Sequence, residues 1–273
     1  MSGKVLANVK NEKIVGTFLI APFGKLSYFG GKVLSLLSHR QIKKFYKIMA
    51  VSQPAVDFAK ELYKQDIETL GICYDFHKYN IKVSRDSSVV EILFLGRLVK
   101  RKGCLTLLKS LVILNNSYPS LTYHVTIAGA GPMSASLTKY SLEHNLSDKV
   151  SFIGFVSETI KIKLLANSDI SVFPSLSGES FGIVLLEAMS TGRSLVIAAA
   201  NPGYAQTLSR VADEVLFTPG DELQLANLLL RYIQDPLERQ AIAIKQQEIA
   251  SSYDQNIVGQ KLLDIYNAAV NPN

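Results

Sequence analysis

Short apolar runs alternate with longer amphipathic segments along most of this chain. From residue 89 onward, the runs at 89–96, 121–129, 150–154, 169–173 and 194–199 each precede a turn and a segment with helical periodicity. Apolar runs of this length, bounded by glycine or proline, predict buried strands, and their alternation with helices predicts βαβ units. The pattern therefore indicates an α/β fold with a parallel sheet.

The first part of the chain carries a shorter version of the same pattern. Strands are predicted at Lys13–Leu19, Tyr46–Val51 and Ile67–Gly71. Ser52 can cap a helix that runs to about Tyr63, because a serine side chain accepts from the free N–H groups of a first turn. The segment Tyr74–Ser88 is polar and irregular, which predicts a linker between domains.

The end of the chain predicts one more short strand, at Glu214–Phe217, followed by helices to the C-terminus. The last of these helices begins near Asp254. Together these patterns predict three parts, over residues 1–82, 83–252 and 253–273.

Composition narrows the class of protein. Nearly half of the 273 residues are hydrophobic, so a large core can be buried. The two cysteines, Cys73 and Cys104, offer neither a disulfide framework nor metal-ligand spacing, which favours a reducing, cytoplasmic setting. No apolar run approaches the roughly 20 residues needed to span a bilayer, and residues 1–13 do not resemble a signal peptide.

Positive charge is concentrated at the front of the chain. Of the total formal charge of +6, nine basic residues and one acidic residue place +8 on residues 1–50, so the remainder sums to −2. The segment Lys25–Lys47 mixes these cations with apolar residues, a pattern typical of a helix lying on an anionic membrane surface, here the inner face of the cell membrane. A solvated helix packed on its own domain fits the same pattern.

Several turns after predicted strands carry residue types suited to phosphate binding. Gly96 and Arg97 end one strand and Lys102 opens the next helix, so two cations could grip a diphosphate. Gly129 and Gly131 form a second turn, without the third glycine of a dinucleotide fingerprint. Each signal alone also fits an ordinary strand-to-helix connection.

The stretch Ser177–Gly192 is the sharpest signal in the sequence. A buried strand runs into a loop that carries Glu179, and a helix begins near Phe181, so backbone N–H groups should point at an anion. Glu187 lies in an apolar setting where an unpaired carboxylate is costly, so it should have a partner. A sugar hydroxyl is a suitable partner.

Four ordered motifs carry a family resemblance: FLGRLVKRKG, VTIAGAGP, FIGFV and GESFGIVLLEAMSTG. Together they resemble the donor domain of family 4 retaining glycosyltransferases, and the last is similar to that of phosphatidylinositol mannosyltransferases and close relatives. Such enzymes have the GT-B fold of two facing Rossmann-like domains. The resemblance implies a complete donor domain over 83–252, a partial acceptor-side domain over 1–82, and a C-terminal helix over 253–273 that crosses back to the first domain.

The resemblance also assigns roles. Arg97 and Lys102 match the pair that binds the donor diphosphate, and Glu179 matches the glutamate that contacts the donor sugar; these three form the implied catalytic set. Glu187 matches the glutamate that holds the nucleotide ribose. The other implied donor-binding residues are Gly96, Gly129, Gly131, Val156 beside the base, and Phe181, Gly182 and Ile183 at the helix start.

The reaction implied is transfer of a sugar, with retained configuration, from a nucleoside diphosphate donor to a lipid or glycan acceptor. GDP-mannose is the best match to GESFGIVLLEAM, while UDP-sugars suit the same scaffold. No Asp-x-Asp pair occurs, so no metal ion is expected. No cofactor besides the donor substrate, and no nucleic acid, is expected either.

The chain departs from the family pattern near its front. Leu19 stands where the family carries a histidine near the reacting centre, and Gln255 replaces a common tryptophan. The residues before the linker resemble only the second half of an acceptor domain, so the opening strands are expected either from a second chain or not at all. Three hypotheses stay open: a transferase, alone or as one subunit of two; a nucleotide-sugar-binding protein that transfers nothing; and another GT-B enzyme such as an epimerase or phosphorylase.

Overall fold

The computed structural model describes residues 13–21, 25–42, 44–81, 83 and 88–271. Residue 43 of the predicted basic segment Lys25–Lys47, and residues 82 and 84–87 of the predicted linker Tyr74–Ser88, lie outside the described residues. The chain divides into two compact units. The first comprises residues 1–74, 178–181 and 253–273, and the second comprises residues 75–177 and 182–252.

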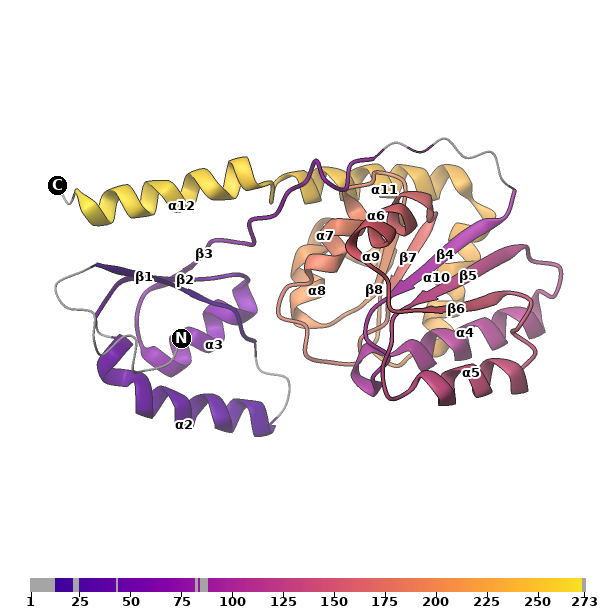
Figure 1. Cartoon of the computed structure of the whole chain (residues 1–273), viewed down its shortest axis with the longest axis horizontal. Helices are drawn as coiled ribbons and strands as arrows, with labels where there is room; N and C mark the ends of the chain where they lie inside the picture. Colours follow the sequence, from indigo (N-terminus) through magenta and orange to yellow (C-terminus); the bar gives the residue numbers. More distant parts are fainter. Residues whose placement is uncertain (1–12, 22–24, 43, 82, 84–87, 272–273) are drawn as a thin grey trace. The chain divides into compact units, whose positions relative to one another are not determined.

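The first unit is built on a parallel sheet of three strands in the order β1-β2-β3 (Figure 1). Among the described residues of this unit, α2 and α3 connect the strands, and α12 is the C-terminal helix. Its elements are β1 (Ile14–Phe18), α2 (Lys25–Ile42), β2 (Phe45–Ala50), α3 (Gln53–Tyr63), β3 (Ile67–Thr69) and α12 (Gln255–Val270). The predicted strands and the helix after Ser52 are confirmed to within two residues.

Hydrogen bonds tie distant segments into this unit. The Ser52 hydroxyl caps α3 by accepting from the Ala55 N–H at 3.3 Å, and it donates to the Ser180 carbonyl at 2.5 Å. The Ser180 hydroxyl accepts from the Ala21 N–H at 2.9 Å. At the other end of the chain, the Gln255 N–H donates to a carbonyl of residue 74. These bonds explain why residues 178–181 and 253–273 belong to the first unit.

Helix α2 has one packed face and one exposed face. At Gly31, an added β-carbon would lie 2.5 Å from the ring of Phe58 on α3, so the missing side chain is what allows this close approach. On another side of α2, Phe29, Val33 and Leu36 follow helical spacing and are 67%, 43% and 79% exposed. The helix predicted over Lys25–Lys47 is confirmed as far as Ile42, whereas residues from Phe45 onward belong to strand β2. The helix presents an apolar stripe to solvent.

The second unit is built on a parallel sheet of six strands in the order β6-β5-β4-β7-β8-β9 (Figure 1). The inner strands are buried on both faces, which is why they are near-continuous apolar runs in the sequence. The strand order reverses at β4, the kind of switch point where ligands bind in open α/β sheets. The strands are β4 (Val90–Leu95), β5 (Tyr123–Ala128), β6 (Val150–Gly154), β7 (Ile170–Phe173), β8 (Leu195–Ala199) and β9 (Leu216–Phe217).

Helices cover both faces of this sheet. Helices α4 and α5 lie side by side, and α4 also packs along α10, while α6 neighbours α7 on the other face (Figure 1). The helices are η1 (Lys100–Lys102), α4 (Cys104–Ser117), α5 (Ser134–Glu143), α6 (Glu158–Asn167), α7 (Ile183–Met189), α8 (Pro202–Thr207), η2 (Ser209–Val211), α9 (Ala212–Val215), α10 (Glu222–Gln234) and α11 (Pro236–Ser251).

Two local predictions need correction. The strand predicted at Glu214–Phe217 is only β9, because the residues just before it form α9. The segment predicted as a linker is not solvated throughout. Phe76 and Tyr79 are 8% and 5% exposed, and residues from Asp75 onward belong to the second unit.

Candidate functional site

A pocket of about 470 Å³ opens at the carboxyl ends of β4, β5 and β6. Parallel strands end at the same edge of a sheet, so the turns that follow them meet there. The pocket is lined by Leu95, Gly96, Arg97, Ala128, Gly129, Ala130, Phe155, Val156, Glu158 and Lys161. Four residues named from the sequence, Gly96, Arg97, Gly129 and Val156, therefore come together.

Glycines allow the two main turns of the pocket to approach each other. A β-carbon on Gly129, whose φ is +152°, would lie 1.8 Å from the Gly96 carbonyl oxygen. A β-carbon on Gly131 would lie 2.4 Å from the Leu98 carbonyl oxygen. The turns are joined by backbone hydrogen bonds, including Gly96 N–H to the Ala128 carbonyl at 3.0 Å. These positions need glycine for packing, whatever they bind.

The two predicted phosphate-binding cations differ in their surroundings. Arg97 is exposed, lines the pocket, and makes no hydrogen bond or ion pair with the other described residues. Lys102 closes η1 and is half-buried, and its side chain passes within about 4.0 Å of the position a β-carbon on Gly96 would take. Arg97 is thus the cation most available to a ligand in this pocket.

Glu187 on α7 is a buried carboxylate, 8% exposed, with partners on two other segments. Its Oε1 accepts from Lys161 Nζ at 2.8 Å and from the Tyr79 hydroxyl at 2.9 Å. Its other oxygen, Oε2, has no donor among the described residues. Because Lys161 also lines the pocket, Glu187 is linked directly to the pocket wall. The prediction that this carboxylate has a partner is confirmed, but the partners found are protein side chains.

Glu158, at the start of α6, extends this network. Its Oε1 accepts from Lys78 Nζ and from the Tyr79 hydroxyl, both at 2.7 Å, and its Oε2 pairs with Lys161 at 2.9 Å. The hydrogen bonds from Lys78, Lys161 and Tyr79 lower the pKa of Glu158 to about 2. Burial and the two carboxylates raise the pKa of Tyr79 well above its ordinary value, so its hydroxyl stays protonated.

Lys161 stays charged in this setting. Burial alone would lower the pKa of its ammonium, but hydrogen bonds to Glu187 and Glu158, together with their charges, outweigh burial and raise it. The site therefore holds a Glu158 carboxylate and a Lys161 ammonium that are both ionised near neutral pH.

Acid should destabilise the second unit through Glu158. Its folded-state pKa of about 2 lies below the ordinary value of 4.5, so its contribution is fully present above about pH 4.5 and is lost as the pH falls toward 2. The carboxylate is half-exposed, so solvent screening limits the effect to about 1 kcal/mol. Urea unfolding across this pH range should show that the free energy of unfolding falls less steeply with falling pH in Glu158→Gln than in the wild type.

The matched control for this measurement is Glu143→Gln, which removes an exposed carboxylate paired with Lys139 on α5 of the same unit. It should keep the wild-type dependence on pH. Identical slopes in the wild type and in Glu158→Gln would contradict the lowered pKa.

The remaining predicted residues stand just before α7 or at its start in the sequence. Gly182 precedes the helix with φ +100° and packs against the ring of Tyr204, where a β-carbon would lie 2.5 Å away. Ile183 is 46% exposed at the first helical position. Glu179 and Phe181 belong to the first unit, where the Phe181 ring packs edge-on against Tyr253 at 5.1 Å. Their predicted contacts with a donor sugar stay predictions.

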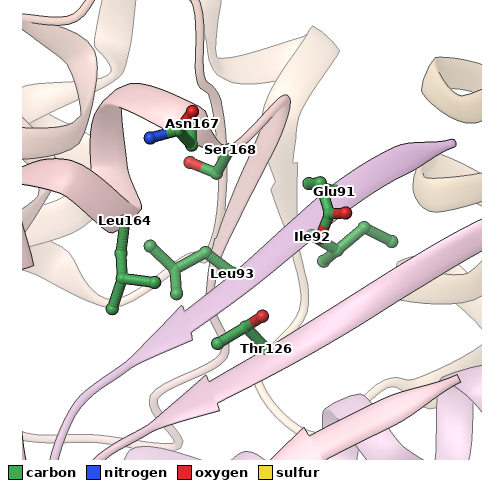
Figure 2. A pocket seen from close by; sticks show the side chains of 7 residues that line it. All are labelled: Glu91, Ile92, Leu93, Thr126, Leu164, Asn167 and Ser168. Atoms are coloured by element: carbon green, nitrogen blue, oxygen red, sulfur yellow. The ribbon is translucent and has the colours of Figure 1, made fainter. Parts of the chain in front are cut away.

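A smaller cavity of about 260 Å³ lies between α6 and the sheet (Figure 2). Leu164, Asn167 and Ser168 at the end of α6 face Leu93 on β4 and Thr126 on β5 across it. This cavity lies on a sheet face rather than beyond the carboxyl ends of the strands. The pocket at Gly96 and Val156 has the position that ligands take in such sheets, so it is the candidate site.

Sequence reasoning missed Tyr79, Glu158 and Lys161. Two signals were present. Glu158 and Lys161 stand three residues apart near the start of α6, shortly after Val156, which is the spacing of an ion pair on one helix face. Tyr79 and Phe76 are large aromatic residues in a largely polar segment. Such residues indicate that this part of the segment is buried against the rest of the protein.

The described residues lack two further kinds of feature. No group of three or more His, Cys, Asp or Glu side chains is placed to hold a metal ion within this part of the chain. Across the same residues, no helix has both the length and the apolar character that crossing a membrane requires.

The parallel sheets and connections define a class of protein. Solved structures with the same fold include a glycosyltransferase from Rickettsia africae, with a TM-score of 0.78, 20% identity and coverage of 97% of this chain and 72% of that one. Another is the Anabaena protein Alr3699/HepE in complex with UDP and glucose, with a TM-score of 0.76, 20% identity, and coverage of 92% and 71%. The chain has the GT-B glycosyltransferase fold, as its motifs predict.

The family follows from the sequence comparison. The profile of the family described as Glycosyl transferases group 1 matches residues 76–248, so the chain belongs to that family. A phosphatidyl-myo-inositol mannosyltransferase of Propionibacterium freudenreichii is 32% identical over 241 residues, covering 84% of this chain and 58% of that protein. A glycogen synthase of Mycobacterium tuberculosis is 30% identical over 181 residues, covering 66% and 42%. The chain spans about half the length of these relatives.

Proposed function

We propose that this chain binds a nucleoside diphosphate sugar in the pocket at the ends of β4, β5 and β6, and that it transfers the sugar with retained configuration and without a metal ion. The observation that carries the proposal is Glu187. It is a buried carboxylate held by one oxygen, with its second oxygen unpaired among the described residues, and its partner Lys161 lines a pocket that also presents Arg97. A carboxylate oxygen can accept from a ribose hydroxyl, and a guanidinium can bind a diphosphate.

The chemistry assigned to Arg97 follows from charge development. When the bond from the sugar to the diphosphate breaks, negative charge grows on the leaving group. A cation fixed next to that group stabilises the transition state more than the ground state. A guanidinium group is charged throughout the physiological pH range, so an arginine can serve this role without a metal ion.

Among the candidate donors, GDP-mannose has the most support. The helix motif matches that of mannosyltransferases, and one relative at 32% identity carries that name. UDP-glucose is the second candidate, because a structure with the same fold was solved with UDP and glucose. A thermal-shift screen of GDP-mannose, UDP-glucose, GDP and UDP tests the donor, since a ligand at a hundredfold excess over its Kd stabilises the folded state by about 2.7 kcal/mol.

The screen and a turnover assay separate the hypotheses. Release of nucleoside diphosphate in the presence of membranes supports the transferase. Tight donor binding without turnover would replace the transferase with a nucleotide-sugar-binding role, which the leucine at position 19 favours. Absence of stabilisation by every nucleotide in the screen would reject the proposed function.

For the acceptor, we propose a lipid or a lipid-linked glycan on an anionic membrane surface, where the chain would lie peripherally. The exposed stripe of Phe29, Val33 and Leu36 supports this, because these apolar side chains lie on a helix that carries three basic residues and no acidic one. Lys32 on the same helix is also exposed. Strand β1, at an edge of its sheet, is where a second chain could add strands, and light scattering of the purified protein measures that association.

Removing the stripe should release the protein from lipid. We expect Phe29→Ser with Leu36→Ser to lower binding to vesicles containing phosphatidylserine by at least about tenfold, because each large apolar side chain contributes about 1.5–3 kcal/mol when fully buried. Co-sedimentation measures the partition. Raising the salt should also weaken wild-type binding.

The matched control for lipid binding is Leu223→Ser, which removes an exposed leucine of the second unit. It should bind vesicles as the wild type does. Unchanged binding by the double variant would exclude this face of α2 as the lipid contact.

A further inference from the structure

Resting on the proposed function, we propose that Tyr79 is a positioning residue for nucleotide binding: it fixes Glu187 through Oε1 so that Oε2 is presented to the ribose hydroxyls. Tyr79 comes from the segment between the first unit and β4, and it needs no contact with the ligand itself. Its effect on the ligand passes through one carboxylate.

The first step of the argument is the geometry at Glu187. Both of its hydrogen bonds, from the Tyr79 hydroxyl at 2.9 Å and from Lys161 Nζ at 2.8 Å, reach the same oxygen. Two donors on one oxygen fix the rotation of the carboxyl group, and they leave the other oxygen to accept from something else. A lone lysine on a flexible stem would fix that rotation less well.

The second step is where the Tyr79 proton goes. The hydroxyl lies 2.7 Å from Glu158 Oε1 and 2.9 Å from Glu187 Oε1, but it has a single proton to donate. Glu158 already accepts from the ammonium groups of Lys78 and Lys161. The hydroxyl is within hydrogen-bond distance of both carboxylates, so its proton is shared between them, and Glu187, with fewer donors, depends on it more.

The third step is the rigidity of the tyrosine. Tyr79 is 5% exposed, and ammonium groups of Lys78 and Lys161 lie 5.4 Å and 5.3 Å from the centre of its ring. Both distances are within the range of cation–π attraction. A ring held in this way delivers its hydroxyl to one place, which is what a positioning residue requires.

The test compares ribonucleotides with analogues that lack the hydroxyls in question. Calorimetry gives the Kd of GDP and UDP, and of their 2′,3′-dideoxy forms, for the wild type and Tyr79→Phe. We expect the wild type to prefer the ribonucleotide by about tenfold or more. Tyr79→Phe should weaken ribonucleotide binding about three- to tenfold and leave dideoxynucleotide binding within twofold.

Matched variants make the test specific. Glu187→Gln should lose most of the preference for the ribonucleotide, and Lys161→Met, which removes the other donor to Oε1, should reduce it. Tyr123→Phe removes a buried tyrosine hydroxyl bonded to Asn115 Oδ1 at 2.8 Å and should bind all four nucleotides as the wild type does. Lys161→Met also keeps the inference testable if Tyr79→Phe folds poorly.

The outcomes separate the two claims. An intact preference in Tyr79→Phe, or an equal loss for ribo- and dideoxynucleotides, would overturn the positioning role. A wild type that binds nucleotides without any preference for the ribose hydroxyls would overturn it as well. A wild type that binds no nucleotide would reject the proposed function itself.

Discussion

Gly129→Ala is expected to destabilise the second unit by more than about 3 kcal/mol and to abolish nucleotide binding. The added β-carbon would lie 1.8 Å from the Gly96 carbonyl oxygen, which belongs to the backbone and cannot rotate away. The φ of +152° is also unfavourable for any residue with a side chain. Relief requires the turns after β4 and β5 to separate, and those turns form the pocket. Urea unfolding measures the loss.

The matched control for that substitution is Gly154→Ala, at the end of the neighbouring strand β6. Gly154 also has a positive φ, +72°, but a β-carbon there meets no atom within 4 Å. Only the left-handed backbone is strained, so the expected loss is about 1–2 kcal/mol. Equal losses in the two variants would mean that the close approach at Gly129 does not exist in solution.

Arg97→Ala is expected to lower kcat/KM for sugar transfer on the order of 10²- to 10³-fold. The reason is that the guanidinium, exposed in the pocket, is assigned to the charge that develops on the diphosphate, and such electrostatic contacts contribute about 2.7–4 kcal/mol to the barrier. The measurement is the initial rate of nucleoside diphosphate release. Because the contact should strengthen in the transition state, kcat should fall along with kcat/KM.

Two further variants control the Arg97 experiment. Lys100→Ala removes an exposed cation three residues away in η1, and it should retain nearly full activity. Arg97→Lys keeps a charge but loses the planar pair of donors, so it should recover only part of the rate. Comparable losses at Lys100 and Arg97 would indicate a general effect of positive charge and would contradict a specific contact.

The strands that build the pocket were predictable because of where they lie. A strand buried on both faces is a nearly unbroken apolar run, so β4, β5 and β6 lie within two residues of their predicted bounds. The four residues of the Glu214–Phe217 run are too few to distinguish a strand from a helical turn, and part of that run is helical. The local pattern of hydrophobic residues does not distinguish a strand from a helical turn when the element is only a few residues long.

The site was predictable in part for a similar reason. The turns carrying Gly96, Gly129 and Val156 had to meet, since neighbouring parallel strands end at one edge. Burial of Glu187 required a partner for its charge, and the sequence indicated that much. Which partner it has depends on contacts between residues 26 and 108 positions apart, with Lys161 and Tyr79, and no local pattern encodes those.

A crystal structure of the protein with GDP or UDP would test the central claim most directly. The account predicts a nucleotide at the carboxyl ends of β4, β5 and β6, with the diphosphate within hydrogen-bond distance of Arg97 and a ribose hydroxyl on Glu187 Oε2. A nucleotide bound in the cavity beneath α6, or anywhere out of reach of both side chains, would contradict it.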